Sequence, residues 1–185
     1  MPPLDDSYAL LPEAQALVAR LVESLSEFGH LSQARVVCVL SQRTPMLHGA
    51  PCAAFVARPH VQGPFAPLFD WCIWRLVGDV LEGEEPDFLI LVDAAIWPYY
   101  DPEERERLIY HELCHIVPKE AEDGSGIRIG RDGRPILTLR PHDAEVFNAE
   151  LVRYGPEVVG IDDTVHAIVE GQKAAKARRR PRRVG

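Results

Sequence analysis

The sequence predicts a single mixed domain of helices and strands, and three observations lead to that prediction. The chain of 185 residues is 46% hydrophobic and 26% charged, which suffices for one good core but not comfortably for two. Apolar runs at residues 35–40 and 88–92 are typical of buried strands. Residues 101–117 carry strong helix signals and contain the pattern HExxH.

Before the HExxH segment, the chain is expected to alternate between helices and strands. Residues 12–28 repeat apolar side chains at helical spacing. A second short strand is expected at residues 53–57, followed by a loop rich in proline and glycine at residues 59–67. The apolar residues within 68–81 follow a helical spacing, which favours a helix there.

The HExxH helix is bounded by recognisable start and stop signals. Asp101 can act as the N-cap, Pro102 suits the first helical position, and Glu104 can close a capping box on Asp101. Pro118 disfavours helical geometry at the residue before it, so the helix should end near that point.

The HExxH pattern predicts a zinc site. Residues four apart lie on the same face of a helix, so His111 and His115 can bind one ion. Glu112 lies about 100° round the helix from His111 and can reach a water on the open side of the metal. We therefore expect Glu112 to be the general base and not a ligand.

A catalytic zinc needs a third protein ligand, which should follow His115 in the chain. A metzincin-type site is excluded, because the third histidine would fall at Ala121. We favour His142, since imidazole suits zinc, and keep Glu145 as the alternative. The candidates considered are His142, Asp143, Glu145 and Glu150.

The remaining C-terminal elements are predicted from turn chemistry and helical spacing. Residues 127–129 and 136–139 flank Gly-Arg-Asp-Gly at 130–133, which is typical of a β-hairpin with an Asp-Gly turn. A helix is expected at residues 142–154, followed by a glycine and a proline, and a last helix at residues 162–177.

Cysteine usage and hydropathy bear on the cellular compartment. The four cysteines are widely spaced without a CxxC pair, which favours reduced, packed thiols. No run approaches the length of a membrane span, and residues 1–6 lack the features of a signal peptide. We expect no membrane association and a cytoplasmic protein, or one carried inside a particle.

The net charge of −8 conceals a basic C-terminus. Residues 173–185 contain seven basic residues and no acid, so we expect a disordered tail after a single domain at residues 1–172. The tail either solubilises the chain, contacts nucleic-acid phosphates weakly, or docks on an acidic protein. Its basic residues are Lys173, Lys176, Arg178, Arg179, Arg180, Arg182 and Arg183.

Four segments resemble the putative phage metallopeptidases: residues 93–97 (DAAIW), 111–116 (HELCHI), 141–147 (PHDAEVF) and 153–155 (RYG). That group is similar in turn to the SprT-like and ImmA/IrrE-type compact zincins. The resemblance implies an α+β, compact zincin-like domain with a small twisted sheet, an HExxH active-site helix and a following ligand helix.

The same resemblance makes specific statements about the site. It implies that His142 is the third metal ligand. It also implies that the edge strand above the HExxH helix receives an extended substrate peptide, with residues 88–92 in that strand or next to it.

The resulting hypothesis is a zinc-dependent metallopeptidase of the gluzincin or SprT-like type, which acts on a peptide or protein. In it His111, His115 and His142 hold Zn²⁺, and Glu112 takes a proton from the water and passes it to the leaving amine. The alternative is a catalytically inactive metal-binding module that acts in assembly or in nucleic-acid-associated complexes.

Overall fold

The chain divides into two compact units, Met1–Pro141 and His142–Gly185. The expected helix at 68–81 lies outside the described residues except for 73 and 81, and so does the basic tail. Within the described part of the chain, no helix combines the length and apolar character needed to cross a membrane. The computed structural model describes residues 7–47, 49–60, 73, 81, 84–121, 124, 126–142, 147–157, 165–166 and 168–170.

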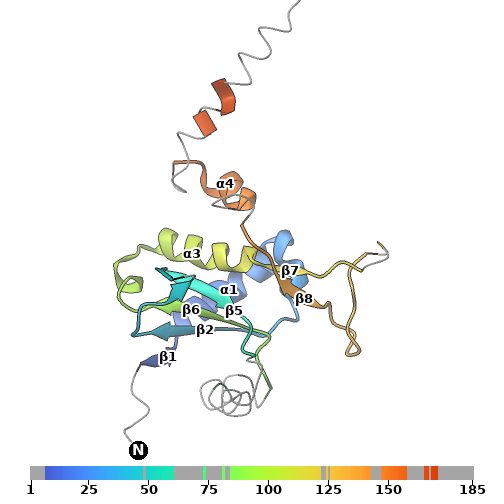
Figure 1. The fold of residues 1–185 in the computed structure, drawn as a ribbon. Helices are drawn as coiled ribbons and strands as arrows, with labels where there is room; N and C mark the ends of the chain where they lie inside the picture. Colours follow the sequence, from blue (N-terminus) through green and yellow to red (C-terminus); the bar gives the residue numbers. More distant parts are fainter. Residues whose placement is uncertain are drawn as a thin grey trace, which may run out of the picture. The chain divides into compact units, whose positions relative to one another are not determined.

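A four-stranded mixed sheet forms the centre of the first unit (Figure 1). The two inner strands run parallel, with Val36 opposite Phe88, and each outer strand is antiparallel to its neighbour. The predicted strands at 35–40, 53–57 and 88–92 are therefore confirmed. In spatial order the strands are β1 (Tyr8–Leu10), β2 (Val36–Ser41), β6 (Phe88–Asp93) and β5 (Ala54–Ala57).

The two inner strands are apolar almost throughout because both of their faces are covered. Val37, Val39 and Leu89 form a buried cluster, since alternate residues of paired strands share a face. Cys38 and Ile90 alternate with these residues and are also buried. Partly buried side chains pack against the cluster, namely Leu10, Ile73, Leu81 and Leu91.

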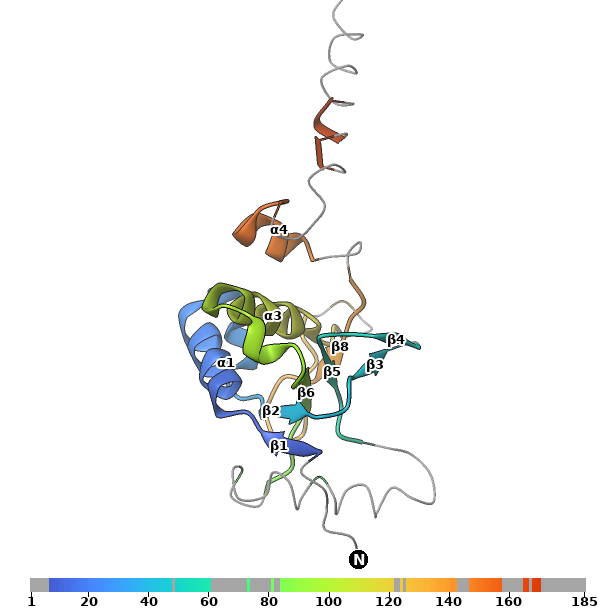
Figure 2. The same ribbon diagram turned by 90° about the vertical axis from the view of Figure 1, so that its left-hand side faces the viewer.

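Helices α1 (Pro12–Ser24) and α3 (Pro102–Cys114) lie beside each other on one face of this sheet (Figures 1 and 2). Gln15 joins α1 to β2, because its amide donates to Val36 O at 2.9 Å and accepts from Cys38 N at 3.1 Å. The helix expected at residues 12–28 ends earlier, at Ser24. The chain continues as the 3₁₀ helix η1 (Ser26–Leu31).

Polar and aromatic contacts fix α3 against α1. Glu13 accepts from Trp97 Nε1 at 3.2 Å and from Arg105 Nη1 at 3.1 Å, and the guanidinium of Arg105 stacks 5.1 Å from the Trp97 ring. Trp97 opens the 3₁₀ helix η2 (Trp97–Tyr99). Further along, the rings of Phe28 and Tyr110 meet edge to face at 5.0 Å. These contacts set the position of the helix that carries HExxH.

The predicted hairpin of residues 127–129 with 136–139 forms only in part. Instead β8 (Leu137–Leu139) pairs with β7 (Ile116–Pro118), the segment directly after α3. Only the inner end of the expected hairpin forms, as a bridge between Ile129 and Pro135 around a turn in which Gly133 has φ +80°.

Two smaller elements complete the described structure. Strands β3 (Met46–Leu47) and β4 (Ala50–Pro51) form a short hairpin between β2 and β5. In the second unit, α4 (Asn148–Tyr154) ends at Gly155, which has φ +85°.

The helix predicted at residues 142–154 therefore begins later than expected, and His142 does not open it. The start of α4 has a local cause, because the Glu150 carboxylate accepts from Phe147 N at 3.4 Å and satisfies an N-H at the helix terminus.

Candidate metal centre

The helix that carries the predicted ligands begins where the sequence indicates. Asp101 Oδ1 accepts from the N-H groups of Glu103 and Glu104 at 2.8 and 2.9 Å. Glu104 returns the interaction, since its carboxylate accepts from Asp101 N at 2.8 Å. The predicted capping box is therefore present, and it marks where α3 begins.

His111 and His115 lie on one face of this helix. Their ring centroids are 5.2 Å apart and their planes meet at 76°. The helix ends at Cys114, earlier than the stop expected near Pro118, because the next residues join the β7–β8 ladder. His115 nevertheless keeps helical dihedral angles (φ −69°, ψ −25°), so the spacing of the two imidazoles is preserved.

Arg140 holds the end of α3 and the ring of His115. Its guanidinium Nε donates to the carbonyl of Cys114 at 2.9 Å, which satisfies an acceptor at the helix terminus. Its backbone N-H donates to His115 O at 2.9 Å. His115 Nδ1 lies 2.8 Å from Arg140 O. A carbonyl only accepts, so Nδ1 carries the proton and Nε2 keeps the lone pair that a metal requires.

His142 follows Arg140 by two residues, so chain continuity alone keeps its Cα within about 7 Å of the Arg140 Cα. His111, His115 and His142 each offer one ligand atom, and these atoms lie within 4.8 Å of one another. His142 is exposed and the other two are partly exposed.

The donor chemistry of this group fits a transition-metal ion. Three neutral imidazoles suit zinc and other late transition metals. The hydrogen bond from His115 Nδ1 to Arg140 O supplies the outer contact that usually orients such a ligand. The three predicted ligands are therefore brought together in a group that can hold a metal ion.

In sequence, Glu112 lies between the two helical histidines. It is buried, with 3% of its surface exposed. Its charge acts on Cys52: burial raises the pKa of that thiol, and the charges of Glu112 and Asp93 raise it further. Cys52 is not a member of the histidine group. Cys38, Cys52 and Cys114 form no disulfide, as predicted, whereas Cys72 lies outside the described residues.

The other candidate ligands have different outcomes. Asp143 and Glu145 lie outside the described residues. Glu150 is buried at 2% exposure in α4, where it accepts from Phe147 N, and it is not a member of the histidine group. The sequence reasoning missed Arg140, which belongs to no recognisable motif, so no local signal marked it.

The fold and the site together define a mixed α and β protein with small sheets, a few helices and a three-histidine group suited to a metal ion. The chain belongs to the putative phage metallopeptidase family, whose model matches residues 7–171. This confirms the predicted resemblance, and the family supports a peptidase role in general terms. No curated protein and no solved structure matches the chain. The similarity to SprT-like and ImmA/IrrE-type proteins stays a prediction.

Proposed function

We propose that this protein is a zinc-dependent metallopeptidase with a compact zincin-like fold. The observation that carries the proposal is the group His111, His115 and His142, whose ligand atoms lie within 4.8 Å of one another. Membership in the putative phage metallopeptidase family supports the same reaction class. A zinc ion bound there would activate a water and polarise the carbonyl of the scissile bond.

The roles of the side chains follow from their chemistry. His115 is oriented by Arg140 O and presents Nε2. Glu112 follows His111 in α3 and is almost fully buried. Glu112 takes the proton of the attacking water and transfers it to the leaving amine nitrogen.

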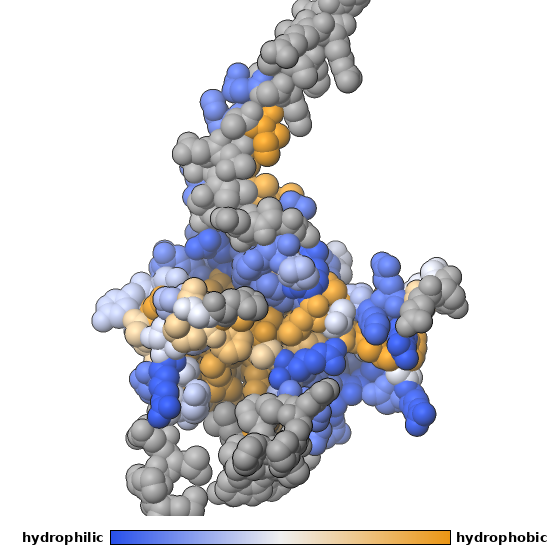
Figure 3. Space-filling model, in the orientation of Figure 1, coloured by the Kyte–Doolittle hydropathy of each residue, from blue (hydrophilic) through white to orange (hydrophobic). Residues whose placement is uncertain are grey.

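The substrate in this proposal is an extended peptide added to the sheet at β5. This strand is the last in the order β1-β2-β6-β5, and β6 with Phe88 lies next to it. Helix α3 packs against β5, which brings that sheet edge close to the HExxH helix. Apolar side chains gather on the same face (Figure 3), and Met46 of the adjacent hairpin is 57% exposed. Among the described residues no strand pairs with the outer edge of β5, and such an edge beside apolar side chains suits β-strand addition.

Metal removal and replacement tests the proposal. The full-length protein is treated with a chelator, dialysed and supplied with Zn²⁺, and each form is incubated with unfolded casein and a degenerate peptide library. Mass spectrometry identifies new peptide termini. Cleavage should appear with zinc and vanish with the chelator.

The Glu112→Gln protein serves as the control for a contaminating protease, because it should bind zinc without cleaving. If the parent binds zinc stoichiometrically and no peptide bond is cleaved, the peptidase proposal fails and the metal-binding interaction module is favoured.

A further inference from the structure

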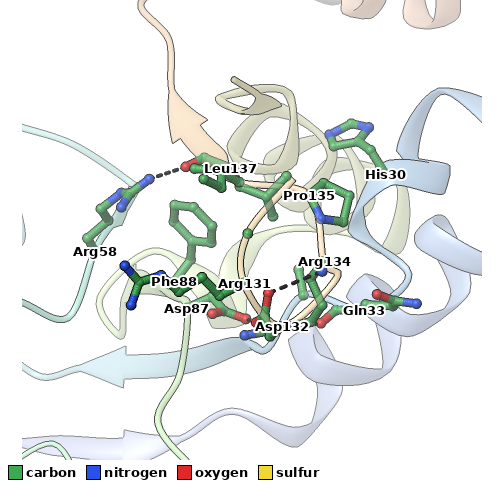
Figure 4. A pocket seen from close by; sticks show the side chains of 13 residues that line it. His30, Gln33, Arg58, Asp87, Phe88, Arg131, Asp132, Arg134, Pro135 and Leu137 are labelled. Atoms are coloured by element: carbon green, nitrogen blue, oxygen red, sulfur yellow. Dashed lines mark hydrogen bonds and ion pairs between the residues drawn. The ribbon is translucent and has the colours of Figure 1, made fainter. Parts of the chain in front are cut away.

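A separate cavity of about 480 Å³ lies at the start of β6 (Figure 4). Its walls come from the loop at residues 130–137, from residues 30–34 at the end of η1, and from Arg58 after β5. A volume of roughly 300–1,000 Å³ is usual for sites that take small molecules or peptide side chains. None of the three histidines of the metal group lines it.

One wall of the cavity is held rigidly by Arg134. Its Nη1 donates to Asp87 Oδ2 and to Gln33 O, each at 3.1 Å, and its Nε donates to Asp132 Oδ2 at 2.8 Å. These bonds tie the 130–137 loop to β6 and η1. The same side chain is drawn beside Asp132 in Figure 4.

The acids of the cavity are already compensated by cations. Burial raises the pKa of Asp87, but hydrogen bonds from the Arg35 backbone and guanidinium, with the charges of Arg35 and Arg134, bring it below its ordinary value. Hydrogen bonds from Arg134 likewise lower the pKa of Asp132. Both carboxylates are therefore ionised and paired at neutral pH.

Two further arginines line the cavity without such compensation. Arg58 donates to Leu137 O and lies over the Phe88 ring, 5.5 Å from its centroid, so its position is set by neutral groups. Arg131 is exposed. Among the described residues, no carboxylate forms an ion pair with Arg58 or Arg131. Two cations in one cavity that form no ion pair with the described acids stand out in a chain with a net charge of −8.

We propose that this cavity binds a phosphate monoester, with Arg58 and Arg131 contacting the phosphate oxygens. The proposal rests on charge matching, because a phosphate monoester carries a charge of about −1.5 to −2 at pH 7. A guanidinium group can also donate two parallel hydrogen bonds to its oxygens. A carboxylate would leave one of the two cations uncompensated. Pro135, Ile136 and Leu137 supply an apolar wall for the organic part of the ester.

The ester can come from a small metabolite or from a phosphorylated side chain, and two probes distinguish these sources. Phenyl phosphate and a short peptide with one phosphotyrosine are titrated into the full-length protein at low ionic strength, with calorimetry as the readout. A chelator is present throughout, so that phosphate cannot bind at a metal. Equal affinities indicate a small ester, and tighter binding of the peptide indicates a phosphorylated protein.

The variants test the residues. Arg131→Gln should weaken binding by about tenfold or more without loss of thermal stability, since its side chain has no bond to the described residues. Arg58→Gln should weaken it similarly. Arg128→Gln is the matched control, because it removes the same charge from an exposed residue that does not line the cavity.

Saturable binding that is lost only in the first two variants supports the site. Equal loss in Arg128→Gln, or no saturation with either probe, would overturn it. The outcome does not depend on peptidase activity.

Discussion

His115 donates its Nδ1 proton to the backbone carbonyl of Arg140 across 2.8 Å, and this bond joins the end of the HExxH helix to the segment that leads into His142. Arg140 also donates to Cys114 O and, through its backbone, to His115 O. Arg140 therefore terminates α3 and orients the imidazole of His115. It also fixes the position of the chain two residues before His142. The metal group depends on the β7–β8 pairing that brings Arg140 back to the helix.

Substitution of Arg140 should affect the stability of the fold more than the binding of a metal ion. Arg140→Ala removes the charged hydrogen bond to Cys114 O but keeps the carbonyl that orients His115. We expect the free energy of unfolding to fall by about 1–3 kcal/mol, measured by urea denaturation of the metal-free protein. Arg128→Ala, at an exposed position, should stay within about 0.5 kcal/mol of the parent. Equal effects of the two changes would mean that the Arg140 guanidinium does not stabilise the helix end.

The identity of the third ligand can be decided by metal content. His142→Ala should lower zinc affinity strongly, because it leaves two of the three imidazoles. Glu145→Ala should leave the metal content close to that of the parent. Zinc is measured after dialysis against a weak chelator. The opposite ranking would assign a site of two histidines and one glutamate.

Glu112→Gln should separate binding from catalysis. The amide cannot accept the proton of the water, so hydrolysis should fall by about 10²–10⁴-fold. Zinc content should remain stoichiometric, because Glu112 is not a ligand in the proposed site. His111→Ala is the comparison, since it should lose metal and activity together. A Glu112→Gln protein that arrives without zinc, or that cleaves like the parent, would contradict the assigned role.

Asp87 should contribute to stability in a way that depends on pH. The pKa of its carboxyl is lower in the folded protein than in the unfolded chain, so its contribution is complete above the unfolded value of about 3.9 and is lost as pH falls through the folded value. Asp87→Asn should therefore lower the unfolding free energy at pH 7, by on the order of 1 kcal/mol.

The difference between Asp87→Asn and the parent should shrink as the pH falls below about 4. Unfolding curves in urea across this range measure it. Glu85→Gln, which removes an exposed acid two positions away, serves as the control. A constant difference between the Asp87 variant and the parent at all pH values would show that charge plays no part.

Truncation after Gln172 tests the basic C-terminus. We expect the shortened protein to keep its zinc and its peptidase activity, because the metal group lies earlier in the chain. Any affinity for DNA or RNA at low salt should disappear, since the remaining chain has a net negative charge and repels a long polyanion. Electrophoretic mobility shifts measure the effect, and equal affinity of both forms would mean that the tail is not the binding element.

Local patterns in the sequence determined much of the first unit. The apolar runs of β2 and β6 indicate strands because central strands are covered on both faces. The start of α3 follows from Asp101 and Glu104, whose capping box needs only neighbouring residues. The spacing of His111 and His115 likewise requires only a helix, which is why these two members of the histidine group could be predicted.

Only the tertiary structure decided which distant segments meet. Hydrophobic periodicity specifies the face of a strand that is buried but not its partner, so the pairing of β8 with β7 was missed. The role of Arg140 depends on that pairing, since its bonds to Cys114 and His115 span a loop of the chain. Tertiary structure also decided the position of β5 at the edge of the described sheet and the cavity between Arg58 and the 130–137 loop. Each feature requires chain segments that no local signal brings together.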